Sequence, residues 1–196
     1  MMLEIRRKLV HASGVFLIFI IIWLGKWNAS LIILLMAVGF FLLGEYRKNK
    51  EKYKIIKSKE LDEIEETVEK MFKEHERPNT LPFKGATEFF IGCFLATVIF
   101  EPTIAIAAIA VLSLADALST LIGSYYGKHK LPINRKKTFE GSIAFFLTAI
   151  FVLLFFANPL KALAVAILAT FAEMIPKIDD NITVPLIVGI VMTLIS

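Results

Sequence analysis

Seven long apolar segments limit what this chain can fold into more than any other feature of its sequence. A helix needs about 20 predominantly apolar residues to cross a bilayer, with about 17 as a lower limit. Hydrophobic residues make up 57% of the 196 positions. The pattern predicts an all-α, polytopic integral membrane protein in a single domain, 1–196. The expected spans are residues 9–25, 29–44, 85–100, 102–122, 141–157, 159–176 and 182–196, of which the third and seventh are short.

The first apolar segment follows Arg6, Arg7 and Lys8, as it does in a secretory signal peptide. However, no small-residue cleavage site follows it, and Trp23 and Trp27 are typical of the interfacial end of a membrane span. We therefore expect this segment to be the first membrane helix.

The positively charged residues indicate the side of the membrane on which each loop lies. If the N-terminus is cytoplasmic, all 22 lysines and arginines except Lys26 and Lys161 lie on the cytoplasmic side. An excess of positive charge is typical of cytoplasmic loops. The distribution predicts a multi-pass protein of the cell membrane with a cytoplasmic N-terminus.

Residues 45–84 form a charged insert between the second and third spans. Within it, Leu61, Ile64, Val68 and Met71 recur at helical spacing. This spacing predicts one amphipathic helix on the cytoplasmic side, resting on its neighbours or on the membrane surface.

Four of the expected spans carry a carboxylate near their cytoplasmic ends: Glu88, Asp116, Glu173 and Asp180. Charged side chains within a bilayer are costly, and they usually mark a site that faces a cavity. The arrangement predicts one acidic site at the cytoplasmic face. The single cysteine, Cys93, lies in an apolar run, so neither a disulfide framework nor a cysteine-based metal cluster is expected.

The loop 123–141 concentrates positive charge beside this acidic layer. Its cations can neutralise the phosphates of a nucleotide, and Thr138 can donate to a phosphate oxygen or bind a metal. The alternative is an ordinary cytoplasmic loop in contact with anionic lipids. Glu140 favours the nucleotide site because a lipid-contact loop needs no acid, although it can also be a helix N-terminal charge. The cations are Lys128, Lys130, Arg135, Lys136 and Lys137.

The acidic residues also have two interpretations each. Asp116 lies among small residues and is either a functional group or a polar contact between helices. Glu173, Asp180 and Asn181 flank Pro176, which is expected to end the sixth span and bring them together. Carboxylate and amide oxygens suit Mg²⁺. The alternative is helix capping by Asp180 or Asn181.

Two smaller charged groups lie near the ends of the first two spans. Arg7 and His11 are one helical turn apart, next to Lys8. Glu45 and Arg47 end the second span in a similar arrangement. His11 is either a pH-sensitive group or a partner for a backbone carbonyl.

Together these motifs resemble the CTP-dependent lipid kinase family of dolichol kinase, phytol kinase and yeast-type diacylglycerol kinase. The resemblance covers nearly the whole chain. Its specific parts are Lys137-Thr138-x-Glu140-Gly141-Ser142 and Glu173 with Asp180-Asn181-Ile182-Thr183-Val184-Pro185. Further matching parts are Arg7-Lys8 with His11, Gly44-Glu45 with Arg47, and Leu114-Ala115-Asp116-Ala117 followed by Gly123 and Gly127-Lys128.

The resemblance implies phosphoryl transfer from CTP, with Mg²⁺, to the hydroxyl of an isoprenoid alcohol or diacylglycerol at the cytoplasmic face. Asp116, Lys137 and Glu140 would carry the chemistry, and Asp116 is the preferred base because it lies deepest. Lipids are the expected partners, nucleic acid is not, and homo-oligomer formation is left open. The nucleotide would be bound by Lys128, Arg135, Lys136, Lys137, Thr138 and Gly141. The metal would be bound by Asp116, Glu140, Glu173 and Asp180. The site or the substrate would be supported by Arg7, Lys8, His11, Glu45, Arg47, Glu88 and Asn181.

Two other functions fit part of the sequence. A phosphatidate cytidylyltransferase also uses CTP and has a similar Lys-Lys-Thr-x-Glu-Gly segment, but its Gly-His-Gly-Gly run is missing after Pro176. An ion or solute transporter should carry polar groups toward both faces, whereas these acids gather on one side. Dolichol kinases are usually longer than this chain, so the resemblance defines the nucleotide site better than the acceptor.

Overall fold

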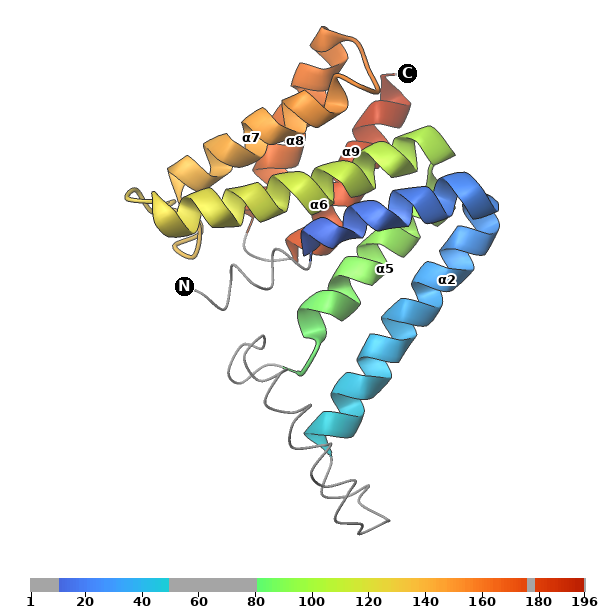
Figure 1. Cartoon of the computed structure of the whole chain (residues 1–196). Helices are drawn as coiled ribbons and strands as arrows, with labels where there is room; N and C mark the ends of the chain where they lie inside the picture. Colours follow the sequence, from blue (N-terminus) through green and yellow to red (C-terminus); the bar gives the residue numbers. More distant parts are fainter. Residues whose placement is uncertain (1–10, 50–80, 176–178, 196) are drawn as a thin grey trace.

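The computed structural model describes residues 11–49, 81–175 and 179–195. Within these ranges the chain is helical, and its one β-type pairing is an isolated bridge between Lys130 and Thr138. The expectation of an all-α fold is therefore confirmed. The elements in Figure 1 are η1 (Ser13–Val15), α2 (Phe16–Lys48), α5 (Lys84–Ile99), α6 (Pro102–Tyr125), α7 (Phe139–Leu153), α8 (Pro159–Met174) and α9 (Asp180–Leu194).

The first two expected spans are the two arms of α2, which bends sharply in Figure 1. The bend is at Gly25, whose φ of 76° and ψ of 164° are not helical. Glycine accepts this conformation because it has no Cβ. The next residue, Lys26, donates from Nζ to the carbonyl oxygen of Phe100 at 2.8 Å, which ties the bend to the end of α5.

Two of the described helical segments are long and apolar enough to cross a membrane, Ser13–Lys48 and Pro102–Tyr125. This finding favours a membrane protein. The remaining expected spans each correspond to a helix, but α5, α7, α8 and α9 have only 15 or 16 residues. The count of seven spans and the cytoplasmic N-terminus therefore stay predictions.

Three sequence predictions fall outside the described residues. They are the placement of Arg7 and Lys8, the amphipathic helix within the insert, and the break at Pro176. On the near side of Pro176, α8 ends at Met174.

Helix α6 is the centre of the fold, and α2, α5, α7 and α9 pack against it. Its buried face is rich in alanine, including Ala105, Ala107 and Ala108. Small residues let neighbouring helices approach closely, as is common in membrane proteins. Large apolar side chains point outward instead, among them Trp23, which is 86% exposed. Such an outer surface fits a lipid environment better than water.

Helix α5 packs against the beginning of α9 with almost no space between them. A Cβ added at Gly92 would overlap the backbone carbonyl oxygen of Asn181. The contact sets the position of the first turn of α9, which carries Asp180.

Candidate active site

Lys137 lies where the C-terminal halves of α6 and α8 meet the first turns of α7 and α9. Its Nζ donates to Oε1 of Glu173 at 2.8 Å and to Oδ2 of Asp180 at 2.6 Å. Glu173 comes from α8 and Asp180 from α9. Asp116, from α6, acts on the same ammonium through its charge. We call these four residues the Lys137 cluster.

Glu173 is held in place by three donors. Its side chain is 1% exposed, and burying a carboxylate is unfavourable unless it is paired and hydrogen-bonded. Ser119 of α6 donates to Oε1 at 3.1 Å, and Ser142 of α7 donates to Oε2 at 3.2 Å. Together with Lys137, these hydroxyls satisfy both carboxylate oxygens.

Asp116 lies on the same face of α6 as Ser119, one turn earlier, and is 1% exposed. Its charge also affects the titration of Lys137. Burial alone would lower the pKa of the Lys137 ammonium, but the negative charges of Asp180, Glu173 and Asp116 raise that pKa well above its ordinary value. Lys137 therefore stays positively charged throughout the physiological range.

The loop before α7 is folded tightly enough to aim Lys137 inward. Leu131 is buried, and its N–H donates to the carbonyl oxygen of Lys137 at 3.1 Å. Lys137 N–H donates in turn to the carbonyl oxygen of Asn134 at 2.9 Å. Asn134 donates from Nδ2 to the carbonyl oxygen of Met174 at 3.3 Å, which attaches the loop to the end of α8.

Thr138 is the N-cap of α7. Its Oγ1 accepts from the N–H of Gly141 at 3.1 Å, and the residue is 3% exposed. A Cβ added at Gly123, Gly127 or Gly141 would crowd the Thr138 side chain. The glycines of the motif thus make room for a buried cap, while the predicted contact of Thr138 with phosphate or metal stays a prediction.

Glu140 lies in the first turn of α7, as its interpretation as a helix N-terminal charge predicted. Oε1 is 2.7 Å from Nδ1 of His129, and both carboxylate oxygens accept from the His129 N–H. Hydrogen bonds from its own N–H and from His129 lower the pKa of Glu140 to about 2. In this structure Glu140 therefore holds the two ends of the loop together.

The other predicted phosphate ligands lie on the surface of the loop. Lys128, Lys130, Arg135 and Lys136 are exposed, whereas the neighbouring Lys137 is turned into the protein. Charge alone could not show which of Lys136 and Lys137 points into the protein. The turn around Asn134 gives the two side chains different orientations.

The start of α9 corrects the sequence-based choice of helix cap. Asp179, rather than Asp180 or Asn181, caps the helix, because its Oδ1 accepts from the Asn181 N–H at 3.0 Å. This frees the carboxylate of Asp180 for Lys137.

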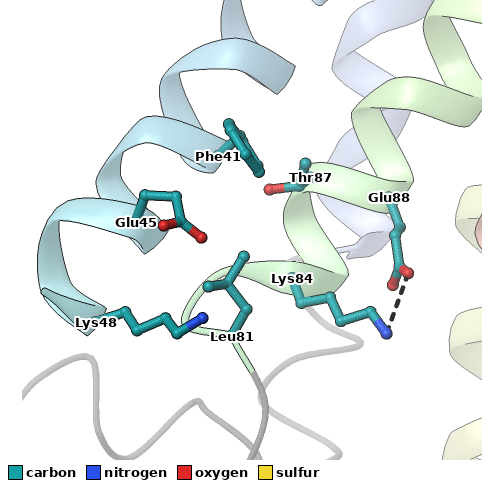
Figure 2. A pocket seen from close by; sticks show the side chains of 7 residues that line it. All are labelled: Phe41, Glu45, Lys48, Leu81, Lys84, Thr87 and Glu88. Carbon is teal, nitrogen blue, oxygen red and sulfur yellow. Dashed lines mark ion pairs between the residues drawn. The ribbon is translucent and has the colours of Figure 1, made fainter.

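The remaining predicted support residues lie away from Lys137. His11 is buried with its ring edge-on to Phe89, with 4.7 Å between ring centroids. Glu45 accepts from Nδ2 of Asn49 at 3.2 Å. The Arg47 guanidinium lies 5.3 Å from the ring centroid of Phe83. Glu45 and Glu88 line a pocket between α2 and α5 (Figure 2).

The Lys137 cluster has the donor chemistry for Mg²⁺ because its acids offer hard oxygen ligands. No group of three or more acidic, histidine or cysteine residues among the described residues is arranged to hold a metal. Lys137 occupies the space between Glu173 and Asp180, and Glu173 is satisfied by its donors. The assignment of Asp116, Glu140, Glu173 and Asp180 as metal ligands therefore stays a prediction.

Sequence reasoning assigned no role to several residues that organise this site. Ser119 lies three positions after Asp116, a spacing that places both on one helix face. Ser142 directly follows the basic motif. Asn134 and His129 act only through the fold of the loop. No pattern in the sequence indicates that fold.

Several curated proteins are similar to this chain. A probable chloroplastic phytol kinase 3 from Glycine max is 35% identical over 122 residues, 53% of this chain and 38% of the relative. A chloroplastic farnesol kinase from Arabidopsis thaliana is 29% identical over 206 residues, 92% of this chain and 62% of the relative. A chloroplastic phytol kinase 1 from the same plant is 28% identical over 123 residues, 53% of this chain and 40% of the relative.

The chain spans less than two thirds of the length of each of these relatives. No family model matches it. No solved structure is significantly similar to it. The similarities nevertheless support the resemblance predicted from the motifs: the chain is similar in sequence to proteins named phytol kinase and farnesol kinase.

Proposed function

We propose that this protein transfers the γ-phosphoryl group of CTP to the hydroxyl of a membrane isoprenoid alcohol, with Mg²⁺ as the cation. The observation that carries the proposal is the Lys137 cluster. The lysine of the motif that resembles the lipid kinases lies near three carboxylates from three different helices. The names of the relatives support an alcohol of the phytol or farnesol type.

The chemistry follows from the general demands of phosphoryl transfer. Catalysis depends mainly on positioning and on neutralising the charge of the transferred group. Lys137 would supply a fixed positive charge to the phosphates, because its pKa is raised and its hydrogen bonds orient it. The exposed cations Lys128, Arg135 and Lys136 would attract the nucleotide to the loop.

Asp116 is the base that we propose for the acceptor hydroxyl. It is almost fully buried within α6, and the proposal requires that a lipid alcohol reach it from the apolar part of the fold. A base must lie within hydrogen-bond reach of the proton that it removes. Bound Mg²⁺, held by Asp116 and Asp180, would supply further charge neutralisation.

The test is the fate of labelled CTP. Purified protein in lipid nanodiscs is incubated with γ-labelled or α-labelled CTP and with phytol, farnesol, polyprenol, diacylglycerol or phosphatidate. Transfer of the γ label to an isoprenoid alcohol is expected. Transfer of the α label with phosphatidate as acceptor would instead establish a cytidylyltransferase. No transfer to any lipid would contradict both enzyme assignments and favour the transporter.

We also propose the seven-span topology with the Lys137 cluster on the cytoplasmic side. The single native cysteine, Cys93, is fully buried, which favours labelling of introduced cysteines over a low background. Lys161→Cys should react with a membrane-impermeant maleimide in intact cells. Lys136→Cys should react only after lysis. The reverse pattern would contradict the orientation.

A further inference from the structure

A pocket of about 540 Å³ lies between the C-terminal end of α2 and the N-terminal end of α5. Figure 2 shows Phe41, Glu45 and Lys48 on the α2 side and Lys84 and Thr87 on the α5 side. Neither the proposed transfer step nor the Lys137 cluster uses this pocket. Glu45, Lys48 and Lys84 in its lining come from the two ends of the charged insert, residues 45–84.

The walls of the pocket are packed rigidly. A Cβ at Gly44 would overlap the carbonyl oxygen of Pro82, so the end of α2 lies directly against the turn before α5. Behind it, Phe40 stacks on Phe90 with 5.4 Å between ring centroids. Phe83 is held in a left-handed conformation, with φ of 60°. Such backbone strain in a residue other than glycine is concentrated at functional sites.

The pocket is connected to the Lys137 cluster by a short chain of contacts. Glu88 lines the pocket, and Gly92, one turn later on α5, lies against the backbone of Asn181. Asn181 directly follows Asp180, which accepts the hydrogen bond from Lys137. One turn of α5 thus separates a pocket residue from the first turn of α9, which carries the carboxylate that holds Lys137.

We infer that this pocket binds the base and ribose of the nucleotide donor, with the triphosphate extending past Asp179 toward Lys137. The inference rests on the proposed function and deepens it, since it gives the nucleoside a place that the basic loop does not supply. Glu45 would accept hydrogen bonds from ribose hydroxyls or an exocyclic amine. Phe41, whose side chain is 46% exposed, offers a ring face for the base.

The chemistry of the lining favours a nucleoside over an isoprenoid alcohol. Glu45, Lys48, Lys84 and Glu88 carry ionisable groups, and an apolar tail placed beside them would remove water without offering partners. A nucleoside instead carries both donors and acceptors that such side chains can satisfy. The two lysines also offset the repulsion between the pocket carboxylates and the phosphates that leave it.

The test separates nucleotide binding from turnover. Binding of a fluorescent CTP analogue to the whole protein in nanodiscs is measured by displacement with CTP, UTP and cytidine, alongside KM values for CTP and farnesol. Glu45→Gln and Phe41→Leu are compared with the wild type. Glu101→Gln, an exposed acid on the loop between α5 and α6, is the matched control.

We expect both pocket variants to weaken CTP binding and raise the KM for CTP about five- to tenfold, as the loss of one hydrogen bond or stacking contact would. Their KM for farnesol should change less than about twofold, and Glu101→Gln should match the wild type. Discrimination between CTP and UTP should also fall, which a purely structural defect would not cause.

A raised KM for farnesol with unchanged CTP binding would overturn the inference and assign the pocket to the acceptor. Unchanged binding and KM values in both pocket variants would also overturn it. If the pocket variants bind CTP more weakly than the wild type but the wild type transfers no phosphoryl group, the inference stands and the proposed function fails. The binding readout therefore distinguishes the two failures.

Discussion

Lys137 donates from Nζ to Oε1 of Glu173 at 2.8 Å, and the carboxylate that accepts this bond is 1% exposed. The two residues lie 36 positions apart and belong to different structural elements, the loop after α6 and helix α8. The pair therefore links the basic motif to the C-terminal acidic motif. The predictions below follow from that link and from the packing that maintains it.

Replacing Lys137 with methionine should abolish phosphoryl transfer and destabilise the fold by about 3 kcal/mol, because Glu173 would be left buried without its cation. Label transfer and thermal unfolding in detergent measure the two effects. The control is Lys161→Met, which removes a charge far from the cluster and should behave as wild type. Retention of at least half of the activity by Lys137→Met would contradict the assigned role.

Replacing Asp116 with asparagine keeps the shape of the side chain and removes its charge. Transfer should fall at least about a hundredfold, the order expected when a general base is lost. The cluster should remain assembled, since Glu173 keeps its own donors. Single-turnover rates with prebound CTP measure this effect. A normal chemical step in Asp116→Asn would mean that another group accepts the proton.

The raised pKa of Lys137 predicts how stability depends on alkaline pH. Its charge contributes stability that is fully present below the unfolded pKa of about 10.4 and is lost as pH rises through the higher folded pKa. Asp180→Asn removes one of the charges that raises the pKa, so in this variant the loss should be smaller and should end at a lower pH. Thermal midpoints recorded from about pH 9 to about pH 12 test this. Parallel curves for the two proteins would contradict the predicted coupling.

The contact between Glu140 and His129 should hold the loop closed. The lowered pKa of Glu140, about 2, keeps this carboxylate ionised at neutral pH, and its contribution to stability is present above its ordinary pKa of 4.5 and is lost as pH falls to about 2. Trypsin should therefore cleave the Glu140→Gln variant after Lys128 and Lys130 several-fold faster than the wild type. Mass spectrometry of timed digests follows the cleavage. Equal cleavage rates in variant and wild type would show that the loop is held by other contacts.

Gly92→Ala should separate α5 from the first turn of α9, because the new Cβ would overlap the Asn181 carbonyl oxygen. Overpacking of this kind costs about 2 kcal/mol. It should also lower activity by displacing Asp180. The matched control is Gly39→Ala, where nothing lies within 4 Å of the new Cβ and a small gain in stability is expected. Equal stability of the two variants would contradict the packing argument.

The helices were largely predictable because each contains an apolar run bounded by turn or charged residues. The exception is instructive. The expected break between the first two spans exists, but it is one glycine, Gly25, with a positive φ. Hydropathy shows where a chain is apolar, but it does not reveal the backbone conformation of a single residue between two such runs.

The sequence by itself determined the all-helical fold, the resemblance to lipid kinases, and the gathering of acids and cations near one end of the helices. These properties depend on composition and spacing, which are local. Only the tertiary structure decided that Lys137 points inward while Lys136 stays exposed, that Asp179 rather than Asp180 caps α9, and that Glu173 is held by Ser119 and Ser142. Those outcomes depend on contacts between distant segments, because a buried charge takes the partners that packing brings to it.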